Sequence, residues 1–176
     1  AELAEAGPEP TGILYFPYLA GSGAPKQVQR ARASFIGVAK THGRKHLLKA
    51  VLEGTAYQLQ AIRTEAEQVA GRAIEKLVVV GGGTRNPHWL QTKADVLKAT
   101  LIAPPIGEAT LLGAALCAGA GAGVYASMDE AAEVSAGLEA SVIRPDEARH
   151  AEYRRLYETG YAPLADTLLD YFRERG

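Results

Sequence analysis

Four consecutive apolar residues, Leu77–Val80, lead directly into three glycines, Gly81–Gly83. A run without polar alternation is typical of a strand that is covered on both faces, as in a parallel sheet. A helix is predicted to begin just after the glycines, because Asn86 is a favourable N-cap residue and Pro87 suits the first helical position. This succession of strand, glycine turn and helix narrows the fold to a layered α/β domain with right-handed parallel crossovers.

The remaining pattern adds helices and short strands around this junction. A long amphipathic helix is predicted over residues 43–70, with Gly71 ending it in the left-handed conformation. Its buried stripe is expected to consist of Leu48, Val51, Leu52, Thr55, Leu59, Ile62, Ala66 and Val69. The other strands are predicted at residues 13–16, 34–38 and 100–103, and the other helices at 86–99, 109–127, 129–135 and from 145 onward, with Pro163 as a kink. Because only two of these strands have core character, the sheet is expected to be incomplete.

The composition limits the partners and the compartment. With 47% hydrophobic residues, 22% charged residues and a net charge of -1, the chain lacks the basic surface that nucleic acids require. The uncharged span 109–127 is mostly glycine and alanine, which are too weakly apolar to drive insertion into a membrane. Residues 1–10 lack the basic and then apolar order of a signal peptide. A cytoplasmic protein is therefore expected, with its single cysteine, Cys117, in the core.

The glycine turn is the first segment that could carry chemistry. A strand that ends in glycines before a helix N-terminus exposes backbone N–H groups and the positive end of the helix dipole, which suit an anionic or planar ligand. It is not a Walker A loop, because no Lys-Ser or Lys-Thr pair follows, and Asn86 stands where a dinucleotide-binding fingerprint has its last glycine. Judged by the glycines alone, a purely structural strand-to-helix turn is an equally good interpretation.

A second informative segment is residues 33–53, ASFIGVAKTHGRKHLLKAVLE, which reads as a strand, a turn and the start of the long helix. It resembles the second signature of the FGGY carbohydrate kinases. The stretch Pro17–Gly21, followed by Pro25, is similar to the family's segment just upstream. Two departures, Lys26–Val28 in place of Trp-Asp-Pro and Ala33 in place of a common glycine, leave the identity of the sugar open.

Further segments follow in the family's order. Residues 81–95 resemble the adenosine-binding turn and helix, and Glu108 with Leu112–Ala115 resembles the helix after the last strand. The tyrosine-rich final helix is similar to the family's C-terminus, so the resemblance covers about residues 12–174. It implies an α/β fold of the actin/hexokinase-like (ribonuclease H-like) ATPase class, in which two lobes hold ATP between them. Residues 1–176 would be a single-domain fragment of the C-terminal lobe, with the first lobe and the start of the second lobe absent.

By the same resemblance, the glycine turn would bind the adenosine of ATP. Gly82 would present its backbone to the nucleotide, while Gly81 and Gly83 would keep the space clear. Asn86 would direct its side-chain amide at the base or ribose and could cap the helix at the same time. Thr84 is a weaker candidate for nucleotide contact, as is Arg85.

No catalytic residue is expected in this chain. The family's catalytic Asp and its Gly-Thr phosphate turns have no match here, so the chain alone is expected to be inactive. The acids in matched segments are each expected in a helix that packs the scaffold; they are Glu53, Asp95 and Glu108. No metal site is expected, because His42 and His46 lack a third ligand nearby. Mg²⁺ would arrive with ATP and be held by the phosphates and by residues outside this chain.

The function implied by the resemblance is ATP-dependent phosphorylation of a sugar or polyol hydroxyl, with the substrate bound through the missing lobe. Two alternatives remain open: a nucleotide-binding or assembly module without chemistry, and a non-sugar ATPase that activates a reductive enzyme. Such activators commonly hold a cysteine-ligated iron–sulfur cluster, for which one cysteine is too few. Neither a nucleic acid nor a membrane is expected as a partner.

The strand at residues 77–80 is expected to have an unpaired edge, because the strands that would cover it in the resembled fold have no match in this chain. An open edge with apolar side chains is a template for association, since backbone N–H and C=O groups need partners. The chain is therefore expected to form a homo-oligomer or to pair with a complementary kinase fragment. A third expectation is that its own run 13–16 or 34–38 covers the edge.

Overall fold

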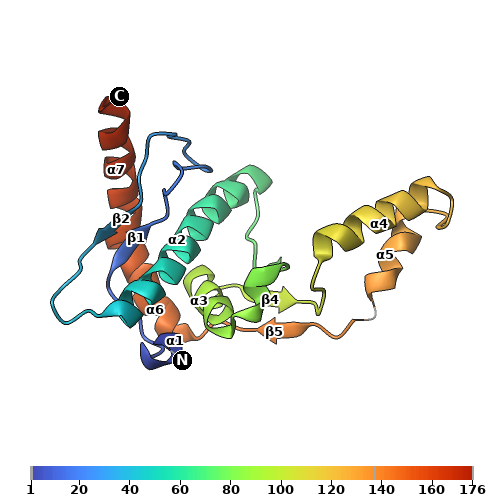
Figure 1. Ribbon diagram of the computed structural model, residues 1–176, viewed down its shortest axis with the longest axis horizontal. Coiled ribbons are helices and arrows are strands. Elements are labelled where there is room, and N and C mark those ends of the chain that lie inside the picture. Colours follow the sequence, from blue (N-terminus) through green and yellow to red (C-terminus); the bar gives the residue numbers. More distant parts are fainter. Residues whose placement is uncertain (1, 137, 176) are drawn as a thin grey trace.

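The computed structural model describes residues 2–136 and 138–175. The N- and C-terminal parts of the chain build a main body, and two helices project from it as an arm (Figure 1). The helical elements are α1 (Glu2–Glu5), α2 (Arg44–Ala70), a 3₁₀ turn η1 (Gly82–Arg85), α3 (Pro87–Leu97), α4 (Ala109–Gly121), α5 (Met128–Ala136), α6 (Glu147–Leu156), a π-helical turn η2 (Tyr157–Tyr161) and α7 (Ala162–Glu174). The strands are β1 (Leu14–Phe16), β2 (Ser34–Ile36), β3 (Lys76–Val78), β4 (Thr100–Ala103) and β5 (Ser141–Ile143).

The strands form two small sheets. β1 and β2 pair antiparallel, with Leu14 opposite Ile36. The second sheet has the order β3-β4-β5, in which β3 is parallel to β4 and β5 is antiparallel to β4. The parallel pair, connected through α3, confirms the predicted β-α-β crossover. The sequence does not predict β5, because three residues are too few to show a strand period.

The second sheet is covered on one face only. Leu77 and Leu101 pack with Leu90 of α3, whereas Val78 and Val80 are 67% and 51% exposed. The expectation that this strand is covered on both faces is therefore wrong for the described part of the chain, in which α2 and α3 form a single layer. The alternation of buried and exposed side chains shows which face of the sheet the described residues leave uncovered.

The outer edge of β3 is open as well. Among the described residues no strand pairs with this edge, and β1 and β2 form a separate sheet. Self-coverage by residues 13–16 or 34–38 is thus excluded, and the prediction of an incomplete sheet is confirmed.

α2 runs close to its predicted bounds, and Gly71 follows it with a positive φ of 64°. The predicted buried stripe is wrong, however, because Leu48, Ile62 and Val69 are 39%, 37% and 91% exposed. The buried positions are Lys49, Ala50, Glu53, Gly54, Ala56 and Tyr57.

The close approach of β1 explains this choice of face. A Cβ atom on Gly54 would lie only 2.1 Å from the carbonyl oxygen of Tyr15, so no larger residue fits at this position. Small residues allow the strand to lie against the helix. The periodicity of large apolar residues, which the prediction followed, does not report such a contact.

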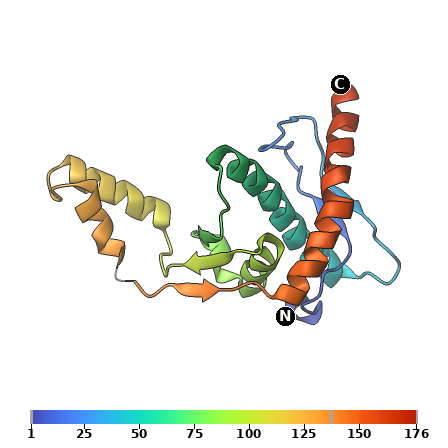
Figure 2. The ribbon, with the colours of Figure 1, turned by 180° about the vertical axis from the view of Figure 1, so that it is seen from behind.

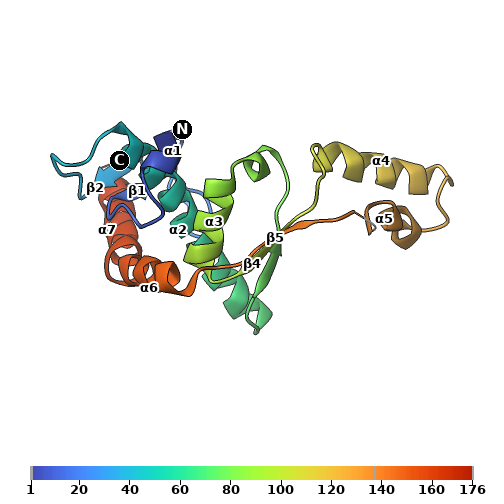
Figure 3. The same cartoon turned by 90° about the horizontal axis from the view of Figure 1, so that it is seen from below.

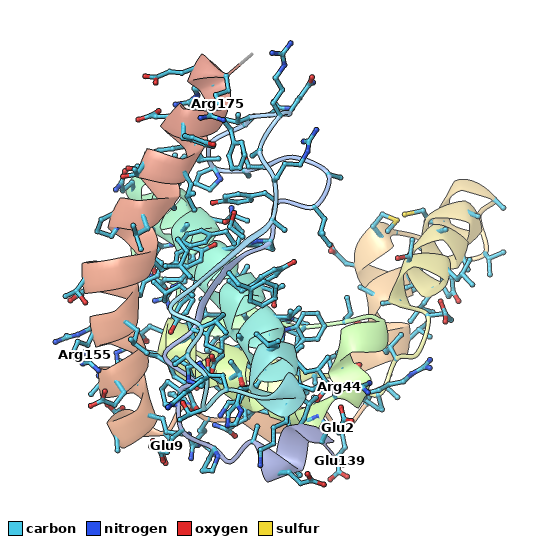
Figure 4. The ribbon with its side chains drawn as sticks, turned by 60° about the vertical axis from the view of Figure 1, so that its left-hand side comes forward. Glu2, Glu9, Arg44, Glu139, Arg155 and Arg175 are labelled. Carbon is cyan, nitrogen blue, oxygen red and sulfur yellow. The ribbon has the colours of Figure 1, made fainter. Side chains whose placement is uncertain are left out.

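The N-terminal segment lies along the first turns of α2. In Figure 4 Glu2 and Arg44 lie near one another, and the Glu2 carboxylate is 3.4 Å from the Arg44 guanidinium. Further along, the Lys49 ammonium donates a hydrogen bond to the carbonyl oxygen of Gly7 at 2.6 Å. Polar contacts with α2 therefore fasten this segment.

Aromatic rings fill the core between β1, α2 and the C-terminal helices, which form one continuous column (Figure 2). Phe16 stacks on Tyr161 with ring centroids 4.6 Å apart, and Tyr57 lies 5.1 Å from the same tyrosine. The irregularity predicted at Pro163 is a π-helical turn, η2, that ends just before it.

The arm consists of α4 and α5, which extend beyond the second sheet (Figure 3). No residue of α4 is buried, and Leu111 is 67% exposed. Cys117 is also exposed on this helix, so its expected place in the core is wrong. Within residues 2–136 and 138–175, no helix is both long and apolar enough to cross a membrane. The arm presents an apolar surface that the main body leaves uncovered.

Candidate nucleotide-binding site

The glycine turn lies at the carboxyl end of β3 and feeds directly into α3. Gly81 has a φ of 92°, a conformation that favours glycine. The turn is closed on its carbonyl oxygen, which accepts hydrogen bonds from the backbone N–H of Thr84 at 3.1 Å and from the Thr84 hydroxyl at 2.8 Å. Asn86 then donates its backbone N–H to the carbonyl of Gly83 at 3.2 Å. The turn is therefore a defined 3₁₀ structure and not an irregular loop.

Asn86 caps α3 as the sequence predicts. Its side-chain Oδ1 accepts a hydrogen bond from the backbone N–H of Trp89 at 3.2 Å, and Pro87 occupies the start of the helix. Because the oxygen is used for the cap, the amide nitrogen is the group left to meet a ligand, and no described residue accepts a hydrogen bond from it. The cap fixes the direction in which that nitrogen points.

The structure gives a different account of glycine at each of the three positions. Gly81 supplies the positive φ. A Cβ atom on Gly83 would lie 2.4 Å from the indole ring of Trp89, so the space at this position is filled by Trp89 and is not kept clear for a ligand. Gly82 is exposed, and a Cβ atom there would meet nothing within 4 Å. The fold itself therefore does not require glycine at position 82.

Thr84 and Arg85, the weaker candidates, differ in their freedom. The Thr84 hydroxyl donates its hydrogen within the turn, so it could meet a ligand only as an acceptor. Arg85 is exposed and, in the described part of the chain, has no carboxylate partner.

A hollow of about 390 Å³ lies beside the turn. It is lined by Thr84, Pro87, Leu90, Gln91, Ala103 at the end of β4, Pro104, Pro105, Ser141 and Ile143. The lining is mixed, with polar groups from Thr84, Gln91 and Ser141 beside apolar ones.

Glu53 is part of the scaffold, as expected. It is 1% exposed and accepts hydrogen bonds from the backbone N–H of Thr11 at 3.1 Å and from the Tyr153 hydroxyl at 3.1 Å. Its partner Lys49 is buried beside it, with Nζ 3.9 Å from Oε1. Burial raises the pKa of the Glu53 carboxyl and lowers the pKa of Lys49. Every oxygen is engaged inside the protein, so none is free to act as a base.

Asp95 has the same structural role. It is 2% exposed and accepts hydrogen bonds from the backbone N–H of Asp146 at 2.8 Å and from the Arg149 guanidinium at 2.7 Å. It thereby ties α3 to the start of α6. Glu108 differs from both, because it is exposed at the start of α4 and packs no scaffold.

The histidines either form hydrogen bonds with the backbone or are exposed to solvent. Nδ1 of His42 accepts from the backbone of Ala39 at 3.0 Å, and Nδ1 of His46 accepts from Gly43 at 2.9 Å. The described residues contain no group of three or more His, Cys, Asp or Glu side chains arranged to hold a metal ion.

Trp89 lies in the segment 81–95 that resembles the adenosine-binding turn and helix, but sequence reasoning gave it no role of its own. Trp89 packs on the turn at Gly83, and its indole N–H donates to the hydroxyl of Thr55 on α2 at 3.0 Å. Its place in that segment, within one helical turn of the Asn86 cap, is the signal that the sequence offers.

Comparison with known proteins shows which family this chain resembles. The family model described as "FGGY family of carbohydrate kinases, C-terminal domain" matches residues 1–122. The xylulose kinase of Bacillus subtilis is 34% identical over 147 residues, which are 84% of this chain and 29% of the relative. The chain therefore spans less than a third of that protein's length.

Solved structures show the same likeness in three dimensions. A ligand-bound xylulose kinase from Lactobacillus acidophilus matches with a TM-score of 0.81 and 21% identity over 99% of this chain and 35% of that one. A Plasmodium falciparum glycerol kinase solved with ADP matches with a TM-score of 0.73 and 26% identity over 91% of this chain and 32% of that one. These matches confirm the predicted fold class, the C-terminal part of an actin/hexokinase-like ATPase lobe.

Proposed function

Because the chain belongs to the FGGY family of carbohydrate kinases and corresponds to their C-terminal domain, we propose that it forms the adenosine-binding side of an ATP-dependent sugar or polyol kinase. The observation that carries this proposal is the exposed Gly82, which stands at a strand-to-helix turn where the fold does not itself demand glycine. The glycerol kinase solved with ADP supports the choice of an adenine nucleotide.

In this proposal the turn binds the nucleotide through its backbone and through one side chain. Gly82 lets the ligand approach the main chain, and the Asn86 amide nitrogen donates to the base or ribose. Gly81 shapes the turn, Gly83 admits Trp89, and Thr84 can accept a hydrogen bond at the rim of the hollow. Binding of this kind holds the adenosine and orients ATP, while the γ-phosphoryl group is the part that is transferred.

Phosphoryl transfer itself is assigned to other parts of a longer kinase. Glu53 and Asp95 are buried in scaffold contacts, and the residues described here offer no cluster suited to Mg²⁺. We therefore place the base, the Mg²⁺ site and the sugar or polyol in the lobes that this chain lacks. Residues 1–176 act in this scheme as one domain, in the cytoplasm, where ATP is available.

The open side of the second sheet is the proposed contact with those lobes. The unpaired edge of β3, the exposed Val78 and the uncovered helix α4 lie on the part of the molecule that has no second layer. A complementary kinase segment would pair with the edge and bury these apolar groups.

Calorimetry with ATP tests the nucleotide site. Gly82→Val places a branched side chain on the approach and is expected to abolish measurable binding. Gly23→Val is the matched control, because Gly23 is also exposed in open space without a positive φ and lies in a different loop. A second readout is the emission of Trp89, the only tryptophan, which is expected to change when ATP binds beside the turn. Equal ATP binding by wild type and Gly82→Val would refute this site.

A further inference from the structure

The indole of Trp89 is held on three sides. Its six-membered ring lies against Gly83, where a Cβ atom would come within 2.4 Å of the ring. Its Nε1–H donates a hydrogen bond to the hydroxyl of Thr55 at 3.0 Å. The ammonium of Lys93 lies 3.6 Å from the centroid of the ring, a favourable cation–π arrangement. The side chain therefore has one well-defined position.

These contacts connect elements that are distant in the sequence. Thr55 lies in the middle of α2, 34 residues before Trp89. On the other side, the backbone N–H of Trp89 donates to the Asn86 cap. A single residue thus joins α2, the glycine turn and the group proposed to meet the nucleotide.

The turn has little else to hold it in place. Gly81 and Gly82 carry no side chains, Gly82 and Arg85 are exposed, and the hydrogen bonds of Thr84 close the turn only on itself. A glycine-rich backbone has many accessible conformations, so an anchor from outside the turn lowers the entropy that a ligand must remove on binding.

We propose that Trp89 is a positioning residue for nucleotide binding, which acts by clamping the glycine turn to Thr55 of α2. The clamp keeps the Gly82 backbone and the Asn86 amide in their binding arrangement before the ligand arrives. This inference rests on the proposed function for its ligand, but the ordering of the turn can be measured without any nucleotide.

The test compares two hydroxyl-to-methyl changes in the 176-residue chain. Thr55→Val removes the acceptor of the indole N–H, whereas Thr92→Val removes a buried hydroxyl of α3 that donates to the backbone carbonyl of His88 in the same helix. Calorimetry is expected to show five- to tenfold weaker ATP binding for Thr55→Val, about the value of one hydrogen bond, and little change for Thr92→Val. Hydrogen exchange is expected to show faster exchange at the amides of residues 82–84 in Thr55→Val only.

A double-mutant cycle separates the clamp from general destabilisation. Trp89→Phe keeps a ring but loses the N–H donor, so combining it with Thr55→Val is expected to add almost no further loss of affinity. Additive losses would overturn the clamp. So would unchanged ATP affinity and unchanged turn exchange in Thr55→Val, even if wild type binds ATP.

The two proposals can fail separately. If wild type does not bind ATP but its turn amides exchange more slowly than those of Thr55→Val, the clamp is supported and the nucleotide site is refuted. If wild type binds ATP and the turn exchanges alike in both proteins, the nucleotide site stands and the clamp falls.

Discussion

Tyr153 donates a hydrogen bond from its phenol to Oε1 of Glu53 at 3.1 Å, across 100 positions of sequence. This contact joins the C-terminal helix α6 to the middle of α2. The same carboxylate accepts the backbone N–H of Thr11, and Lys49 lies beside it. One buried acid thereby holds the N-terminal segment, α2 and α6 together.

The effect of replacing Glu53 on stability is expected to depend on the side chain that takes its place. Glu53→Ala leaves Tyr153 and Thr11 without their buried acceptor and Lys49 without its buried counter-charge, and it is expected to lower the free energy of unfolding by about 3–5 kcal/mol. Glu53→Gln keeps an acceptor and removes the cost of burying a charge, so its loss is expected to be much smaller. Urea denaturation of both variants checks this, and equal losses would show that the hydrogen bonds do not matter.

The raised pKa of Glu53 predicts that the stability of the fold depends on pH. Burial raises the pKa of Glu53 above its ordinary value of 4.5, so the folded protein holds a proton there that the unfolded chain has already released. The contribution of this group to stability is therefore full below pH 4.5 and is lost as the pH rises through the raised pKa. Glu53→Gln is expected to lack this decline when unfolding is measured across the range, and a parallel decline in both proteins contradicts the assignment.

Two glycine-to-alanine changes are expected to have opposite signs. At Gly54 a methyl group would lie 2.1 Å from the carbonyl oxygen of Tyr15, so Gly54→Ala is expected to separate α2 from β1 and cost several kcal/mol. At Gly113, in the uncovered helix α4, nothing lies within 4 Å, and alanine is expected to stabilise by about 0.5–1 kcal/mol through helix propensity. Denaturant midpoints measure both, and a loss at Gly113 would mean that α4 packs against another surface.

The open sheet is expected to make the chain self-associate when no other lobe is present. Val78→Lys places a charge on the uncovered face next to the free edge and is expected to shift the protein toward monomer. Val69→Lys is the control, because Val69 is 91% exposed at the far end of α2. Sedimentation over a wide concentration range is the measurement. A wild-type monomer at every concentration, with freely exchanging amides at 77–80, contradicts this expectation.

The chain alone is expected not to phosphorylate any sugar or polyol. Its buried acids are engaged in scaffold contacts, and the proposed function places the phosphate turns outside this chain. An assay of ADP release with glycerol, xylulose and related polyols tests this. Sugar-dependent turnover above about 1 s⁻¹ would be in the usual range of enzymes and would refute the division of labour proposed here.

The sequence predicts those parts of the structure that depend on local chemistry. Asn86 and Pro87 mark the start of α3, and Gly71 marks the end of α2, because caps and left-handed turns select residue types directly. These signals also locate the turn that forms the candidate site.

The parts that could not be predicted depend on contacts between distant segments. Contact with β1 determines which face of α2 is buried. This contact requires glycine at position 54, which a periodicity of large apolar residues does not count as a buried position. The indole ring of Trp89 fills the space beside Gly83. It is held there by its hydrogen bond to Thr55, a contact that the sequence does not show. In the second sheet, Val78 is exposed because no described element covers that face, which an apolar run does not report.

The π-helical turn η2 sets the rotational phase of the helix that follows it. A π-helical turn contains one residue more than an α-helical turn, and each residue of an α-helix advances the direction of the side chains by about 100°. Without that extra residue, α7 would emerge rotated by roughly this angle, and Leu169, now 3% exposed, would leave the aromatic core. The number of residues between Tyr153, Tyr157 and Tyr161 thus determines which face of α7 packs on the core. A chain shortened by a single residue at Thr159 would still form α7 but would turn another face of this helix toward the core.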